Sequence, residues 1–141
     1  MIRHANAVWA GDLKSGQGHL TTASHTLNNT AYSFHTRFED GQGTNPEELI
    51  AAAHAGCFAM AFSAVLGENG FTPERLDATA HVTLEPVDGK PTVSKSHLVL
   101  TARIPGIDAA KFEELSHAAK AGCPISRLLN TEITLDATLE N

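Results

Sequence analysis

The sequence predicts a single domain of the α+β class, with antiparallel sheets and a long buried helix at its centre. The chain of 141 residues is long enough for one domain with its own hydrophobic core. Its strand-like segments come in groups and do not alternate with helices, which favours antiparallel pairing. One segment, residues 46–66, is apolar over most of its length. We therefore expect residues 1–141 to form one domain.

The first third of the chain is predicted to form strands. Residues 4–11, 18–27 and 31–38 are rich in β-branched and aromatic side chains, with partial alternation of apolar and polar positions. Turn residues separate these segments, including the glycine-rich sequence GDLKSGQG. In this interpretation Arg37 lies at the end of the third strand.

A long helix is predicted over residues 46–66. Asn45 is a good N-cap, Pro46 suits the first helical position, and Glu48 completes the pattern of a capping box. Glu47 and Glu48 lie in the first turn, where the helix dipole favours negative charge. The rest of the helix is apolar on nearly every side, so one sheet cannot cover it. We infer a homo-oligomer with this helix near its centre.

The second half of the chain predicts a hairpin, two helices and a closing strand. The sequence VDGK is a hairpin signal between two alternating segments in residues 75–104. Asp108 is expected to cap a helix that ends at Gly122. A short helix follows over residues 123–130, and residues 131–140 are expected to form the last strand.

Composition and charge exclude several classes of function. Sixteen acidic residues against ten Lys and Arg give a net charge of −6 without a basic stripe, so nucleic-acid binding is not expected. Residues 49–66 contain His54 and Ser63 and lack interfacial anchors, which favours a buried helix over a membrane span. No signal-peptide pattern opens the chain, and it has only two cysteines. We therefore expect a reducing, cytoplasmic compartment.

The residues alone leave the roles of Cys57 and Cys123 open. The two cysteines are too far apart in the chain for a CxxC motif, and a buried free cysteine commonly behaves as a small hydrophobe. Cys123 begins a helix directly before Pro124, a position that makes a thiol more reactive. Cys57 lies beyond the reach of its own helix N-terminus. A reactive Cys57 therefore needs a positive charge from elsewhere.

Arg37 is the candidate for that charge. A guanidinium beside the thiol favours the thiolate and can hold an oxygen substrate. Such an arginine needs a carboxylate partner, and Glu47 or Glu48 can provide it. The alternative, which the residues leave open, is that Arg37 is a solvated charge and the glutamates serve only the helix dipole.

Metal and cofactor chemistry finds little support in the sequence. His54 and Cys57 share a helix face at a spacing that suits two metal ligands, but a zinc site needs three or four. The other histidines are scattered without motif spacing, and no dinucleotide or phosphate-binding motif is present. We expect no metal and no cofactor.

The sequence YSFHTRFEDGQGTNPEELIAAAHAGCFAMAFSAVLGENGFTP closely resembles the osmotically inducible protein C/organic hydroperoxide resistance (OsmC/Ohr) family. The segments VWAGDLKSGQG, IPGID, AKAGCPISRLL and EITLDATL resemble it as well, so the similarity spans essentially the whole chain. Arg37 within HTRFEDGQGTNPEE, together with the absence of arginine from GDLKSGQG, resembles the OsmC branch.

The resemblance implies an OsmC-like fold, an intertwined homodimer and a cofactor-free peroxidase that reduces organic hydroperoxides to alcohols. By motif, Cys57 in HAGCF corresponds to the peroxidatic cysteine and Cys123 in AGCPIS to the resolving cysteine, with a disulfide between them. Arg37 is expected to hold the thiolate and the peroxide, and Glu47 to orient Arg37. Whether Glu48 shares that role is open.

The same resemblance implies an external dithiol reductant, of the lipoyl type or another thiol donor, and active sites with residues from two chains. Phe58, Met60 and Phe62 are expected to form apolar walls for the alkyl tail of the peroxide. Two other functions remain open. One is a peroxide-sensing thiol switch without significant turnover, and the other is a small-ligand binding module with incidental thiols.

Overall fold

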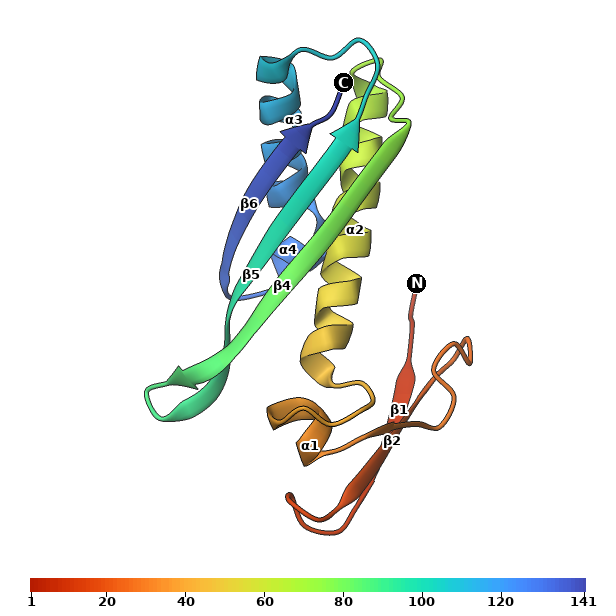
Figure 1. Ribbon diagram of the computed structural model, residues 1–141. Helices are drawn as coiled ribbons and strands as arrows, with labels where there is room; N and C mark the ends of the chain where they lie inside the picture. Colours follow the sequence, from red (N-terminus) through yellow and green to blue (C-terminus); the bar gives the residue numbers. More distant parts are fainter. The chain divides into compact units, whose positions relative to one another are not determined.

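The computed structural model describes all 141 residues (Figure 1). The chain forms two compact units, Met1–Leu49 and Ile50–Asn141. The boundary between them falls within one long helix, α2 (Pro46–Glu68). The assignment of residues 1–141 to one domain stays a prediction.

The N-terminal unit contains a three-stranded antiparallel sheet of β1 (Ala5–Ala10), β2 (Gln17–Thr22) and β3 (Thr30–Tyr32). Trp9, Gly18 and Tyr32 lie in one row across the three strands. The Trp9 and Tyr32 rings approach to 5.6 Å between centroids. A Cβ on Gly18 would lie 2.4 Å from Tyr32 Cε1 and 2.7 Å from Trp9 Cε3. Glycine at this position therefore allows the two rings to meet.

The strand prediction for residues 34–38 is wrong, because Phe34–Phe38 forms the short helix α1. Ser33 and Thr36 make a reciprocal capping box at its start. Ser33 Oγ accepts from the Thr36 N–H at 3.3 Å, and Thr36 Oγ1 accepts from the Ser33 N–H at 2.9 Å. This local capping outweighs the β-propensity of the segment. Arg37 consequently lies in the last turn of a helix and not at a strand end.

The C-terminal unit contains a sheet in the order β4-β5-β6. The hairpin of β4 (Arg75–Val87) and β5 (Lys90–Arg103) is antiparallel, as predicted, and turns through Asp88 and Gly89 at φ 52° and 77°. The prediction of antiparallel pairing fails for β6 (Glu132–Leu139), which is parallel to β5. The connection through α3 (Ala109–Gly122) and α4 (Pro124–Leu128) is long enough to return the chain in the direction of β5.

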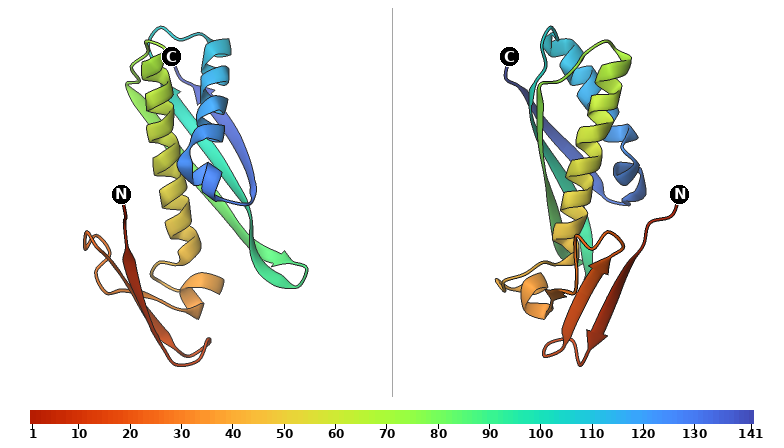
Figure 2. Two further views of the ribbon diagram at one scale, coloured as in Figure 1. Left: turned by 180° about the vertical axis from the view of Figure 1, so that it is seen from behind. Right: turned by 90° about the vertical axis from the view of Figure 1, so that its right-hand side faces the viewer.

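The core of this unit lies between the sheet and the helices α2 and α3, which cover the same face of the sheet (Figure 2). The Phe62 ring packs against Phe58 at 6.2 Å and against Phe112 of α3 at 5.9 Å between centroids. Inward-facing residues alternate along β5, as expected for a sheet with one covered face. The fully buried apolar side chains of α2 and β5 are Phe58, Phe62, Leu66, Leu98 and Leu100.

One face of α2 remains uncovered within the C-terminal unit, so the prediction of a buried helix holds there only for its phenylalanine face. Between residues 50 and 67 the exposed positions recur with helical spacing and carry small or apolar side chains: Ala52, Ala53, Gly56, Met60, Ser63, Ala64 and Gly67. Met60 is 78% exposed. By length and composition this helix is the one in the chain that could cross a membrane. Its phenylalanine face packs in the core of the C-terminal unit.

Candidate active site

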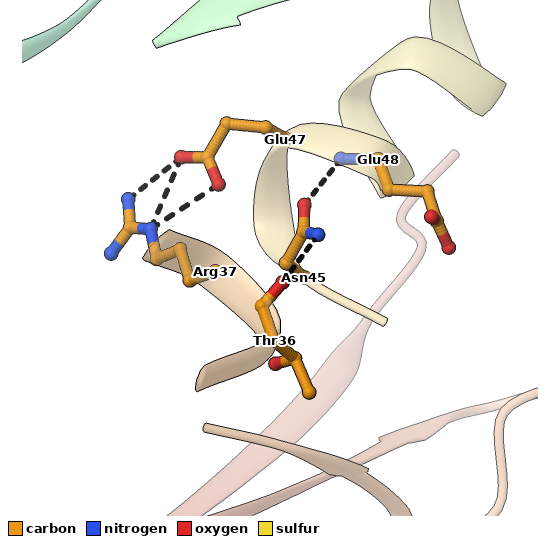
Figure 3. A network of polar contacts seen from close by, with 5 residues as sticks. All are labelled: Thr36, Arg37, Asn45, Glu47 and Glu48. Carbon is orange, nitrogen blue, oxygen red and sulfur yellow. Dashed lines mark hydrogen bonds and ion pairs between the residues drawn. The ribbon is translucent and has the colours of Figure 1, made fainter. Parts of the chain in front are cut away.

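Arg37 and Glu47 form an ion pair in the N-terminal unit (Figure 3). Arg37 Nη2 lies 2.8 Å from Glu47 Oε1, and Arg37 Nε lies 3.2 Å from both carboxylate oxygens. Glu47 is buried, whereas the Arg37 side chain is 38% exposed. Between the two predicted partners of the arginine, the structure therefore selects Glu47.

Glu48 has a different role, at the start of α2. Its backbone N–H donates to Asn45 Oδ1 at 2.8 Å, which confirms Asn45 as the N-cap. Its carboxylate accepts from Thr44 Oγ1 at 3.0 Å, so only half of the predicted capping box is formed. Asn45 Nδ2 also donates to the carbonyl of Thr36 at 2.8 Å (Figure 3). Asn45 thus ties α1, which carries Arg37, to the first turn of α2.

An apolar cavity of about 310 Å³ adjoins Arg37. The guanidinium carbon of Arg37 lies 5.2 Å from the centroid of the Phe38 ring, within the range of a cation–π interaction. The cavity thus combines one cation with aromatic walls, a composition that suits a molecule with an oxygen head and an apolar tail. Its other lining residues are Trp9, Leu13, Tyr32, Ser33 and Phe34.

The expectation that Phe58, Met60 and Phe62 form apolar walls for the substrate stays a prediction, although Cys57 packs against the core that contains both phenylalanines. Phe58 and Phe62 are fully buried in the core, and Met60 is exposed on the other side of α2. The aromatic residues beside Arg37 come from β1, β3 and α1, and only the strand register brings Trp9 to Tyr32. The sequence contained one signal of this aromatic pair, Gly18, which lies between Trp9 and Tyr32 in the sheet.

The two cysteines come together in the C-terminal unit and are free thiols. Cys57 is half-buried in the middle of α2, and Cys123 is fully buried at the junction of α3 and α4. Burial raises the pKa of the Cys57 thiol, and the contact with the Cys123 thiol raises it further. The backbone N–H of Ile125, in the first turn of α4, donates to the Cys57 sulfur and opposes this rise in pKa.

His54 is a fully buried residue one helical turn before Cys57. Its Nδ1 lies 2.7 Å from Ser96 Oγ, and its Nε2 lies 2.8 Å from Ser126 Oγ. Burial lowers the pKa of His54, since the charged imidazolium is disfavoured away from water. Both ring nitrogens are engaged by hydroxyl groups, so neither is free for a metal. The chain contains no group of three His, Cys, Asp or Glu residues that could hold a metal ion.

The four predicted site residues therefore form two pairs. The ion pair of Arg37 and Glu47 belongs to the N-terminal unit, and the thiol pair of Cys57 and Cys123 belongs to the C-terminal unit. The chemistry available is a cation beside an apolar cavity in one unit and two adjacent thiols in the other.

Comparison with known proteins identifies the family. The model of the OsmC family, described as OsmC-like protein, matches residues 39–138. The chain belongs to the OsmC family. It is 50% identical over 139 residues to the peroxiredoxin OsmC of Escherichia coli strain K12, a match that covers 99% of this chain and 97% of that protein. It is 32% identical over 101 residues to an organic hydroperoxide resistance protein-like protein of Staphylococcus aureus strain USA300, covering 69% of each.

Solved structures confirm the OsmC-like fold. An OsmC-like protein of unknown function from Vibrio cholerae has a TM-score of 0.77 at 17% identity, with 97% of this chain and 99% of that chain covered. The organic hydroperoxide resistance protein OhrB of Bacillus subtilis has a TM-score of 0.69 at 25% identity, with 97% and 98% covered. The OsmC fold predicted from the sequence is therefore correct.

Proposed function

We propose that the protein is a thiol-dependent peroxidase that reduces organic hydroperoxides to alcohols. The observation that carries this proposal is the contact between the thiols of Cys57 and Cys123, in a chain half identical to a peroxiredoxin. Two adjacent cysteines suit a reaction in which one sulfur is oxidised and the other closes a disulfide.

The first step takes place at Cys57. Its thiolate attacks the distal oxygen of the hydroperoxide, the O–O bond breaks, and the alkoxide leaves and takes up a proton to become an alcohol. The sulfur loses two electrons and becomes a sulfenic acid, while the peroxide is reduced. Cys57 is the better candidate for this step because it is half-buried, whereas Cys123 is fully buried.

Arg37 is proposed to provide the positive charge that this step needs. Burial and the second thiol raise the pKa of Cys57, which disfavours the thiolate at neutral pH. Each unit of that rise corresponds to about 1.4 kcal/mol. A guanidinium offsets this cost and stabilises the leaving alkoxide. Glu47 engages Nε and Nη2 of Arg37, which leaves Nη1 for an oxygen of the substrate.

The second step regenerates the enzyme. Cys123 attacks the sulfenic acid of Cys57, the two sulfurs form a disulfide, and water leaves. An external dithiol, of the lipoyl type or another thiol donor, then reduces the disulfide by two exchange reactions and becomes a disulfide itself. The aromatic cavity beside Arg37 is proposed to receive the alkyl or aryl tail of the peroxide.

We further propose that the protein is a cytoplasmic homodimer, with active sites that take residues from both chains. The uncovered face of α2 supports this proposal, because it carries a row of small and apolar side chains around the exposed Met60. A second copy of the same helix offers a complementary surface, since small residues allow close approach. A two-fold interface of this kind uses the same patch on both subunits.

A steady-state assay with cumene hydroperoxide and a dithiol tests the proposal. Wild-type protein is expected to consume many equivalents of peroxide per chain, and Cys57→Ser to consume none. Cys123→Ser is expected to stall as a sulfenic or sulfinic acid, which intact-mass analysis detects. Val87→Ser, at the exposed hairpin tip, is the control.

Full activity of Cys57→Ser would overturn the proposal. Consumption of a single equivalent by wild type, with dithiol in excess, would identify a thiol switch instead.

A further inference from the structure

We propose that His54 is a positioning residue, which holds α4 so that Cys123 remains against Cys57 during the resolving step. The imidazole does this by bridging Ser126 on α4 and Ser96 on the central strand β5. The inference rests on the proposed function, because it assigns a role within the step that forms the disulfide.

Two contacts join α2 to the start of α4: the pair of thiols and the hydrogen bond between His54 and Ser126. His54 lies three residues before Cys57 on α2, and Ser126 lies three residues after Cys123 on α4. The hydrogen bond of His54 and Ser126 is therefore placed one helical turn away from the thiol pair. The other ring nitrogen is anchored to Ser96, which is fully buried. The imidazole thus connects α4 to the core of the sheet.

The helix α4 has few other attachments. It spans five residues, none of them fully buried, and its N-terminus has no side-chain cap. Leu128, in its last turn, is 73% exposed. Ile125 packs at the edge of the core, and its N–H donates to Cys57. The bond from Ser126 to His54 is therefore the side-chain hydrogen bond that ties α4 to the core.

The resolving step depends on this attachment. A disulfide requires Cα atoms about 4.4–6.8 Å apart and properly directed Cβ atoms. If α4 moves away, Cys123 cannot reach the sulfenic acid of Cys57. That sulfenic acid then meets a second hydroperoxide and is oxidised to a sulfinic acid, with release of a second alcohol. Loss of the His54 bridge should therefore slow disulfide formation without slowing the first attack on the peroxide.

The chain offers variants that separate the two ends of the bridge. His54→Asn places an amide near Nδ1 and keeps a partner for Ser96, whereas His54→Gln places one near Nε2 and keeps a partner for Ser126. Ser126→Ala removes the hydroxyl from a half-buried position on α4, and Ser126→Thr retains it. His117→Asn, on the exposed side of α3, is the control.

The test is a single-turnover reaction with cumene hydroperoxide, followed by dimedone trapping of sulfenic acid and intact-mass analysis. His54→Asn and Ser126→Ala are expected to form sulfenic acid at the wild-type rate. They should form the disulfide at least about tenfold more slowly, as misplacement of a reacting group predicts. Both should accumulate sulfinic acid, and His54→Gln and Ser126→Thr should lie close to wild type. A general loss of structure would instead slow both steps and lower the melting temperature.

A wild-type rate of disulfide formation in Ser126→Ala would overturn the inference. So would equal slowing in Ser126→Ala and Ser126→Thr, because only one of them lacks the hydroxyl. Diamide oxidises the thiol pair without any peroxidase step and separates this inference from the proposed function. If wild type ignores hydroperoxides, the proposed function fails. Even then, slower formation of the disulfide by diamide in Ser126→Ala than in wild type would support the role of His54. Equal rates of disulfide formation in the two proteins would refute it.

Discussion

Arg37 and Glu47 form a forked ion pair, with Nη2 at 2.8 Å from one carboxylate oxygen and Nε at 3.2 Å from both. Arginine supports this geometry because its guanidinium is planar and presents several donors in fixed directions. The Glu47 carboxylate is buried, whereas the Arg37 side chain is 38% exposed. The pair therefore holds a cation in a set orientation beside an apolar cavity.

Removing the Arg37 guanidinium should abolish most of the peroxidase activity while leaving the protein folded. We expect Arg37→Ala to lower kcat/KM by about a hundredfold or more, typical for the loss of one electrostatic stabiliser of a transition state. Arg37→Lys should recover little, because an ammonium cannot reproduce the fork. Steady-state kinetics with cumene hydroperoxide measures the effect. Arg75→Ala, which breaks an exposed ion pair with Asp77, is the control. If Arg37→Ala kept near-normal activity and that activity still required both cysteines, the proposal that Arg37 stabilises the thiolate and the leaving alkoxide would be wrong.

Glu47 and Glu48 should differ in their effects on activity. Glu47→Ala is expected to lower kcat/KM, but less than Arg37→Ala, because Glu47 acts through the arginine that it orients. Glu48→Ala should leave kcat/KM near wild type and cost about 0.3–1 kcal/mol of stability through the helix N-terminus. Kinetics and urea denaturation of both variants measure the contrast. Equal losses of kcat/KM in Glu47→Ala and Glu48→Ala would show that the ion pair of Arg37 and Glu47 does not explain the loss of activity.

Gly18→Ala should destabilise the N-terminal sheet. A methyl group at this position would lie 2.4 Å from Tyr32 Cε1 and 2.7 Å from Trp9 Cε3. Overpacking of this kind costs about 1–3 kcal/mol. The single tryptophan reports the change by fluorescence during denaturation. Gly122→Ala, where an added Cβ meets nothing within 4 Å, is the matched control. An unchanged tryptophan transition in Gly18→Ala would show that the two rings do not meet over this residue.

The buried imidazole of His54 should make stability depend on pH. Burial lowers the pKa of His54 in the folded protein below its usual value of 6.5. Below pH 6.5 the unfolded chain therefore binds a proton that the folded protein does not bind, and the free energy of unfolding decreases as the pH falls. The slope approaches about 1.4 kcal/mol per pH unit for one proton.

Urea denaturation from about pH 8 to pH 5 measures this dependence. His54→Gln should lose less stability than wild type over the same interval, because it carries no titrating group at this position. Parallel curves for the two proteins would contradict the prediction.

Met60→Lys should convert the proposed dimer to a monomer. The side chain is 78% exposed within the chain, at the centre of the uncovered face of α2. A lysine in an apolar interface between two copies would be desolvated without a partner. Light scattering at micromolar concentration measures the mass. Leu128→Lys adds the same charge at a residue that is 73% exposed outside α2, and should leave the mass unchanged. A monomeric wild type would refute the proposed dimer.

The sequence by itself determined those features that depend on neighbouring residues. The start of α2 was predicted at Pro46, because Asn45 and Pro46 are strong local signals, and the helix begins there. The β4–β5 hairpin follows from its Asp-Gly turn. The short helix α1 was missed, because Ser33 caps it with Thr36 in place of the Glu or Gln typical of a capping box.

The tertiary structure decided how residues far apart in the chain combine. Both Glu47 and Glu48 suited the role of partner to Arg37, and only the packing of α1 against the first turn of α2 selects Glu47. The direction of β6 depended on the path of α3 and α4, which also brings the Ile125 N–H to Cys57. The conformational propensities of neighbouring residues predict local features such as a helix start or a hairpin turn. Contacts such as that of His54 with Ser126 arise because burial of apolar faces brings separate elements together and requires their buried polar groups to find partners.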